Sequence, residues 1–184
     1  MSIEFFYDVV SPYTYLAMTQ MARIAQEAET EVRWRPFYLG AVFKATGNAP
    51  PALVPARGQY MLKDLYRWAG SYGTDFNFPS IFPANSLLAM RALTLLPEGE
   101  REAPSLAIGR AYWVDGRDPS DPGLIAEHVG QDIVDRAREA KDTLRESTDE
   151  AVSRGAFGAP TFFVNGKMYF GNDRLHFVVR AAKS

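Results

Sequence analysis

The chain has no cysteine and only two histidines, His128 and His176, among its 184 residues. The absence of cysteine excludes structural disulfides, thiolate nucleophiles and thiolate metal sites. The two histidines are far apart in the sequence, and neither lies in an acidic motif of the kind that binds zinc. We therefore expect no metal centre.

The sequence also lacks an excess of one charge and a long apolar run. Its formal net charge is −2, with acidic and basic residues interspersed, so neither a nucleic-acid interface nor a membrane-binding face is predicted. No run approaches the roughly 20 apolar residues of a membrane span, and the first residues lack the basic region of a secretory signal. We expect a cytoplasmic protein that binds a small molecule.

The N-terminal residues predict a strand, a helix and a second strand. Residues 3–7 are apolar, residues 12–27 have apolar side chains at helical spacing, and residues 32–36 alternate between apolar and basic side chains. Two strands joined by a helix of this length are usually parallel and right-handed. Residues 3–37 are therefore interpreted as one βαβ unit.

The following part of the chain predicts helices and loops without a strand, and a polar helix is expected at 131–153. The C-terminal residues predict a hairpin: Thr161–Val164 is an apolar strand, Asn165-Gly166 is typical of a two-residue turn, and residues 167–170 return before a last short helix. This order predicts an α/β, thioredoxin-like fold made of residues 1–39 and 131–184, interrupted by an all-helical insertion at 40–130.

A Ser-Pro pair, Ser11-Pro12, follows the first strand and opens the first helix. Thioredoxin-like folds have Cys-Pro-x-Cys at this position, where the helix N-terminus lowers the pKa of the first thiol. Serine followed by proline is also a common way to begin a helix, as N-cap and first helical residue. On these two residues alone, both interpretations stay open.

A second candidate element is Ala159-Pro160, just before the first hairpin strand. Proline is tolerated at a strand start without special meaning, but a cis proline here in a thioredoxin-like fold faces the Ser11 turn and frees main-chain groups for a bound peptide. A third element, Gly171-Asn172-Asp173, is suited to capping the last helix. Its carboxylate is also suited to a ligand's ammonium group, and glutathione, as an extended tripeptide, would join all three elements.

The chain resembles, over essentially its whole length, the 2-hydroxychromene-2-carboxylate isomerase family, a DsbA-like branch close to the kappa-class glutathione transferases. The matching segments are Tyr7-Asp8-x-x-Ser11-Pro12-x-x-Tyr15-Leu16-Ala17, Lys44 with Gly47-Asn48, residues 60–68, Phe82-Pro83-x-Asn85-Ser86, Gly158-Ala159-Pro160-Thr161 and Gly171-Asn172-Asp173-Arg174.

The resemblance implies a homodimeric, glutathione-dependent isomerase that acts in the degradation of aromatic, naphthalene-like compounds. A glutathione thiolate, held by the hydroxyl of the catalytic residue Ser11, would add reversibly to a conjugated carbon of the substrate. The residues expected to bind glutathione are Ser11, Asn48, Ala159, Pro160, Gly171, Asn172 and Asp173. The residues expected to contact the aromatic substrate are Lys44, Tyr13 and Phe82.

The sequence departs from the family pattern after Asn48, where apolar residues 50–55 replace an expected Asn-Arg pair. This departure affects the binding of a substrate carboxylate and leaves the expected glutathione site unchanged. Two alternatives stay open: a kappa-like glutathione transferase, whose product keeps the sulfur, and a non-catalytic thioredoxin-like module that binds peptides. The Asn172-Asp173 pair argues against the peptide-binding module.

Overall fold

A four-stranded mixed sheet is the centre of the fold in the computed structural model, which describes residues 2–184. The strands lie in the order β2-β1-β3-β4, with β1 parallel to β2 and β3 antiparallel to both β1 and β4. Their bounds are Ser2–Tyr7 for β1, Glu31–Pro36 for β2, Thr161–Val164 for β3 and Lys167–Phe170 for β4. The predicted βαβ unit and the predicted hairpin are both confirmed.

Ten α-helices and four short 3-10 helices surround this sheet within the described residues. The α-helices are α1 (Pro12–Met18), α2 (Met21–Ala28), α3 (Leu39–Thr46), α4 (Pro55–Tyr72), α5 (Leu87–Leu95), α6 (Glu102–Trp113), α7 (Pro122–Val129), α8 (Gln131–Arg136), α9 (Lys141–Ser153) and α10 (Leu175–Ala182). The 3-10 helices are η1 (Pro51–Leu53), η2 (Glu98–Glu100), η3 (Ala137–Ala140) and η4 (Asn172–Arg174). No described helix is long and apolar enough to cross a membrane.

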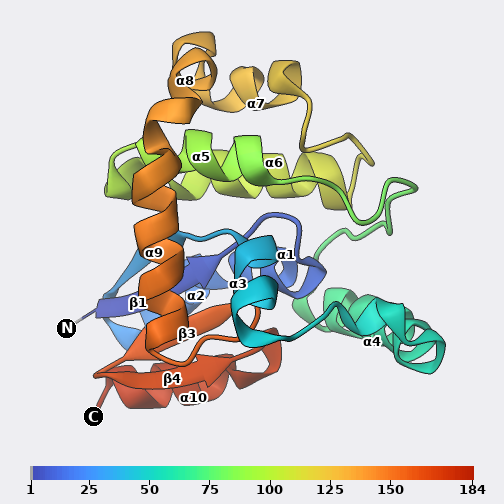
Figure 1. The fold of residues 1–184 in the computed structure, drawn as a ribbon. Helices are drawn as coiled ribbons and strands as arrows, with labels where there is room; N and C mark the ends of the chain where they lie inside the picture. Colours follow the sequence, from blue (N-terminus) through green and yellow to red (C-terminus); the bar gives the residue numbers. More distant parts are fainter. Residues whose placement is uncertain (1) are drawn as a thin grey trace.

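Alternate side chains of β1 enter two different hydrophobic cores. Ile3, Phe5 and Tyr7 are buried in the larger core, together with residues of α2, α5 and α10. Phe6 faces the other side of the sheet, where it is buried with Phe163 and with residues of α3 and α9. In Figure 1, α9 runs down in front of the sheet, α10 lies low in the view beside β4, and α5–α8 lie together at the top of the view.

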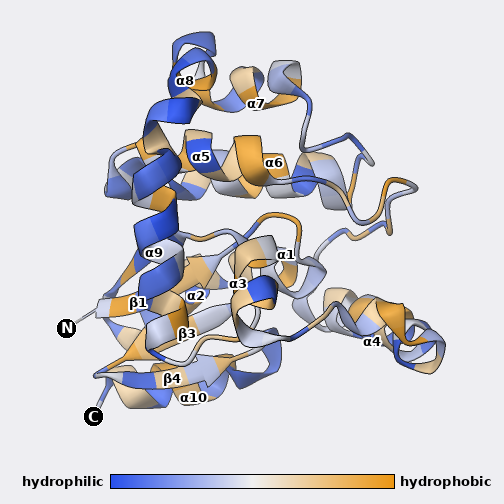
Figure 2. Cartoon of the chain, in the orientation of Figure 1, coloured by the Kyte–Doolittle hydropathy of each residue, from blue (hydrophilic) through white to orange (hydrophobic). Residues whose placement is uncertain are grey.

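Ion pairs hold α9 against the outer side of the sheet. Arg154, directly after α9, donates to Glu4 of β1 at 2.6 Å, and Arg35 of β2 donates to Glu150 of α9 at 2.5 Å. The Arg154 guanidinium also lies 3.8 Å from the centre of the Phe163 ring, a cation–π contact. The remaining surface of α9 is hydrophilic along much of its length (Figure 2), as expected for a helix that faces solvent.

Two helices that the apolar spacing predicts as continuous are interrupted. The predicted helix at 12–27 breaks at Thr19, whose hydroxyl donates to the Leu16 carbonyl at 2.7 Å. A threonine side chain that bonds its own helix competes with the main-chain pattern. The predicted helix at 131–153 contains the tighter turn η3 between α8 and α9. Apolar spacing continues across both breaks, so it did not reveal them.

The helix α3, which the sequence analysis did not predict, begins directly after β2. Its first residue, Leu39, donates its N–H to a carboxylate oxygen of Asp8 at 2.9 Å. Lys44, expected to contact the aromatic substrate, therefore lies in the last turn of this helix. The next helix, α4, extends away from the sheet at one side of the molecule (Figure 1).

Candidate functional site

Ser11 lies at the N-cap of α1, at the end of β1 where the chain leaves the sheet. Its Oγ accepts the N–H of Thr14 at 3.2 Å, so the capping interpretation of Ser11 is confirmed. The same hydroxyl donates to the carbonyl oxygen of Ala159 at 3.1 Å, across 148 positions of sequence. The Ser11 side chain therefore caps α1 and also faces the loop that contains Ala159 and Pro160.

The proline loop contains a cis Ala159–Pro160 peptide bond. The carbonyl of Ala159 accepts the Ser11 hydroxyl, and the carbonyl of Pro160 accepts the N–H of Gly171 at 3.0 Å. Within residues 2–184 the N–H of Ala159 has no hydrogen-bond partner. The loop thus connects the Ser11 turn to the Gly171 turn and leaves one main-chain donor beside them.

The turn at Gly171 brings a carboxylate to the same place. Gly171 has a φ of +98°, a backbone conformation that favours glycine. A Cβ at this position would lie 2.5 Å from the Asp173 carboxylate and would displace it. Asn172 is buried, and its carbonyl accepts the hydroxyl of Tyr72 at 2.8 Å. Asp173 is partly exposed and forms an ion pair with Arg174.

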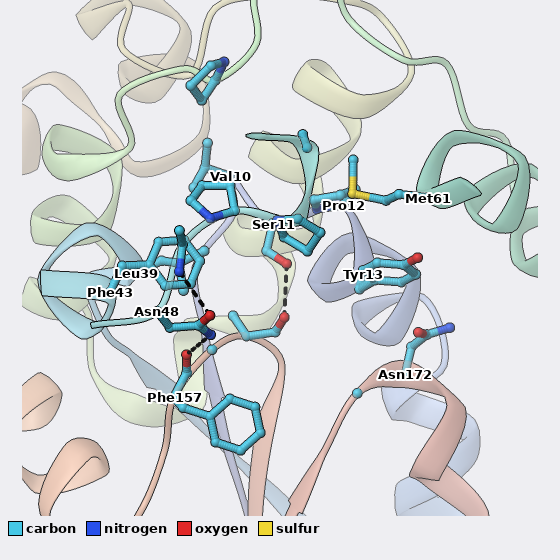
Figure 3. A pocket seen from close by; sticks show the side chains of 18 of the residues that line it. Val10, Ser11, Pro12, Tyr13, Leu39, Phe43, Asn48, Met61, Phe157 and Asn172 are labelled. Carbon is cyan, nitrogen blue, oxygen red and sulfur yellow. Dashed lines mark hydrogen bonds between the residues drawn. The ribbon is translucent and has the colours of Figure 1, made fainter. Parts of the chain in front are cut away.

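One cavity of about 810 Å³ joins these three elements. This volume is near the upper end of the range of roughly 300–1,000 Å³ that is usual for small-molecule sites. Most of the wall is apolar or aromatic, and Figure 3 shows Val10, Tyr13, Leu39, Phe43 and Met61 around Ser11, with Phe157 and Asn172 below it. The cavity therefore has room for a polar ligand at the proline loop and an apolar one beside it.

The structure brings most of the predicted site residues together. The cavity is lined by Ser11, Tyr13, Asn48, Phe82, Ala159, Gly171, Asn172 and Asp173. Pro160 is adjacent, and Asn48 donates from Nδ2 to the Phe157 carbonyl at 2.8 Å, which closes one side of the cavity (Figure 3). Lys44 is exposed and does not belong to the lining.

Arg57 and Asp64, which the sequence analysis did not select, also line the cavity. Both are on α4, and Asp64 accepts the Tyr13 hydroxyl at 2.9 Å. Burial first, and then this hydrogen bond, raise the pKa of Tyr13 above its ordinary range, so the phenol stays protonated. The positions of Arg57 and Asp64 in the sequence have the helical spacing typical of a solvent-facing surface. The sequence therefore gave no indication that either residue lines a cavity.

Asp8 is a buried carboxylate beneath the cavity wall, completely inaccessible to solvent. It accepts the N–H of Val10 at 3.1 Å, the N–H of Leu39 at 2.9 Å and the hydroxyl of Ser86 at 2.9 Å. Burial raises its pKa to about 6, although the three hydrogen bonds act in the opposite direction. Asp8 thus connects three segments of the chain that line the cavity.

A thioredoxin fold with a serine at the first helix and a facing cis proline defines a thioredoxin-superfamily protein without the redox cysteines. Residues 2–183 match the family of DSBA-like thioredoxin domains, and the chain belongs to this family.

Named relatives of two kinds match nearly the whole chain. A 2-hydroxychromene-2-carboxylate isomerase of Sphingobium xenophagum is 32% identical over 188 residues, covering 96% of this chain and 95% of the relative. Glutathione S-transferase kappa 1 of Caenorhabditis elegans is 32% identical over 204 residues, covering 96% of this chain and 88% of the relative. A solved 2-hydroxychromene-2-carboxylate isomerase superimposes with a TM-score of 0.87 at 29% identity, covering 98% of this chain and 94% of that one.

Proposed function

We propose that the protein is a glutathione-dependent isomerase of the 2-hydroxychromene-2-carboxylate type, acting on a small aromatic compound. The observation that carries the proposal is the hydrogen bond from the Ser11 hydroxyl to the Ala159 carbonyl in a cavity that also contains Asn172 and Asp173. The relatives of this protein among isomerases and kappa-class transferases support the same chemistry. We further propose a role in the breakdown of aromatic compounds and a cytoplasmic location.

The cavity residues fit glutathione at each of its polar groups. The Asp173 carboxylate is suited to the ammonium of the γ-glutamyl end, with Asn172 and Gly171 beside it. The unpaired N–H of Ala159, next to Pro160, is suited to the main chain of the central residue in the way that an extended peptide binds a strand edge. Asn48 and Arg57 line the same cavity, and the guanidinium of Arg57 is suited to the glycyl carboxylate.

Glutathione, when bound, supplies a thiolate that adds reversibly to a conjugated carbon and then leaves, so that it is not consumed. Ser11 is suited to stabilise this thiolate, because a hydroxyl that donates to sulfur favours the charged form and lowers the thiol pKa from about 8.5. Neither histidine lines the cavity in the described chain, and Ser11 is therefore assigned as a hydrogen-bond donor and not as a nucleophile. Tyr13 and Phe82 provide aromatic surface for contact with the second substrate, the aromatic compound.

A kappa-like glutathione transferase is the second candidate, and it is favoured by the relatives that carry this name. The two functions share every residue assigned to glutathione. They differ in the product, which keeps the sulfur only in the transferase. Mass analysis of the product formed with glutathione therefore separates them.

The first test is a titration of the protein with glutathione between about pH 5 and pH 9, following heat and the ultraviolet absorbance of the thiolate. Saturable binding with a thiol pKa below its value in free solution is expected. Absence of binding would exclude both the isomerase and the transferase, and would leave the peptide-binding module as the alternative.

We also propose that the protein is a homodimer. Its helix α4 carries exposed apolar side chains at Leu62 and Tyr66, which are four residues apart and therefore share one side of the helix. Exposed apolar surface often marks a contact between proteins.

A further inference from the structure

The charges that line the cavity are few and unevenly placed. Among the lining residues that the structure describes, only Arg57, Asp64 and Asp173 are charged. Asp64 accepts the Tyr13 hydroxyl, and after burial and this hydrogen bond the charges of Asp64 and Asp173 also contribute to the raised pKa of Tyr13. Asp64 therefore lies on the Tyr13 side of the cavity, and Figure 3 shows Asn172, the residue before Asp173, on the same side.

The opposite wall, formed by α3, is uncharged. Tyr38, Leu39, Gly40 and Phe43 line it, and Figure 3 shows Leu39 and Phe43 on the side of Ser11 away from Tyr13. Lys44 is the next residue after Phe43, but it is exposed and outside the cavity. The side chain that α3 directs toward the site at this turn is thus a phenyl ring and not an ammonium group.

The main-chain N–H groups at the start of α3 do not provide the positive charge that the α3 wall lacks. The N–H of Tyr38 donates to the Thr148 hydroxyl at 3.0 Å, and the N–H of Leu39 donates to the Asp8 carboxylate at 2.9 Å. A carboxylate of the protein already occupies the place where a helix N-terminus would bind an anion. A second carboxylate at this wall would lose hydration and meet the negative charge of Asp8.

Arg57 is the one cation of the described lining, and the proposed function assigns it to the glycyl carboxylate of glutathione. Resting on that proposed function, we propose that the second substrate is an uncharged aromatic compound with a conjugated carbonyl and no carboxylate. It packs against the α3 wall formed by Leu39 and Phe43. The carboxylate named in the isomerase relatives is therefore absent from the substrate of this chain.

The test compares two ligands that share one ring system, 2-acetylnaphthalene and the anion 2-naphthoate, by calorimetric titration of the wild-type protein. We expect the neutral ketone to bind about 10- to 100-fold more tightly, because the α3 wall against which the ring packs offers no cation to the desolvated anion. Naphthoate that binds as tightly as the ketone, or more tightly, would overturn the proposal.

Two neighbouring substitutions sharpen this comparison. Phe43→Lys places a cation at the α3 wall, and we expect it to raise the affinity for naphthoate about tenfold or more while weakening the ketone. Lys44→Gln removes the adjacent cation outside the cavity and is the matched control, with no change for either ligand. Thermal unfolding checks that the Phe43→Lys protein is folded; if it is not, the wild-type comparison alone decides.

Each titration is repeated with saturating S-methylglutathione, an unreactive thioether that occupies the proposed glutathione site. Because it engages Arg57, the preference for the ketone is expected to increase in its presence. If S-methylglutathione does not bind but the ketone preference is present, the proposed function fails and the charge preference of the cavity stands. If S-methylglutathione binds and naphthoate is preferred, only the proposal of an uncharged substrate is rejected.

Discussion

At the scale of single residues, the Ser11 hydroxyl is the group on which the proposed chemistry depends. It is 5% exposed and lies between the α1 N-terminus and the Ala159 carbonyl. Ser11→Ala is expected to lower kcat about 10- to 1000-fold, because a donor to the reacting sulfur is lost. The pKa of the bound thiol should return toward about 8.5, as measured by thiolate absorbance against pH.

Ser153→Ala is the control for this change. The Ser153 hydroxyl donates to the Glu150 carbonyl at 2.8 Å at the exposed end of α9, and it does not line the cavity. Turnover and thiol pKa should both equal those of the wild type. A wild-type rate in the Ser11→Ala protein would contradict the assigned role of Ser11.

Asp173 is the residue expected to recognise the ammonium group of glutathione. Asp173→Asn keeps the size of the side chain and removes its charge. A charge-assisted hydrogen bond at a partly exposed position is worth about 1–2 kcal/mol, so the KM for glutathione should rise about 5- to 30-fold with kcat little changed. A glutathione analogue without the α-amino group should bind the wild type and Asp173→Asn equally, and unequal binding would reject this contact.

At the scale of elements, the strands and the hairpin were predictable because their signals are local. Asn165 and Gly166 both have positive φ values, 51° and 74°, as a two-residue turn between antiparallel strands requires. The start of α3 was not predictable, since it depends on a contact between distant residues, Asp8 and Leu39. The break at Thr19 involves a local hydrogen bond to Leu16, but Thr94 makes a similar bond inside the unbroken helix α5, so a threonine alone does not indicate a break. Arg57 and Asp64 were missed because only the packing of α4 against α1 brings them to the cavity.

Asp8 connects β1, α3 and the start of α5, and its effect on stability should depend on pH. Its folded-state pKa of about 6 is above that of an unfolded aspartate, so the folded chain binds the proton more strongly. The contribution of Asp8 is therefore greatest at low pH and decreases as pH rises. The loss between about pH 4 and pH 7 is about 2 kcal/mol in the free energy of unfolding.

Asp8→Asn removes this titration while keeping an oxygen for the Leu39 N–H and the Ser86 hydroxyl. Urea unfolding of both proteins at about pH 4 and pH 7 measures the difference. Relative to the wild type, Asp8→Asn should gain about 2 kcal/mol of stability between the two pH values. An equal stability difference at both pH values would show that Asp8 does not titrate in this window.

At the scale of the whole molecule, the proposed dimer predicts a sedimenting mass twice the 20.5 kDa of one chain. Leu62→Glu places a charge in the exposed apolar surface of α4 and should shift the protein to the monomer. Lys141→Glu places the same negative charge on the polar surface of α9, and the dimer should persist. A monomeric wild type would reject the homodimer while leaving the fold and the cavity unchanged.

The hydrogen bond from Ser11 to the Ala159 carbonyl also limits what a binding measurement can detect. The hydroxyl has one proton, and without a ligand that proton is already engaged at 3.1 Å. A thiolate that takes the proton exchanges one acceptor for another, and the number of hydrogen bonds made by the hydroxyl stays the same. Affinity for glutathione should therefore change little when Ser11 is altered at a pH below the pKa of the bound thiol, and should fall as the pH rises above it, because this pKa and the affinity for the thiolate are linked. The rate should change strongly at either pH.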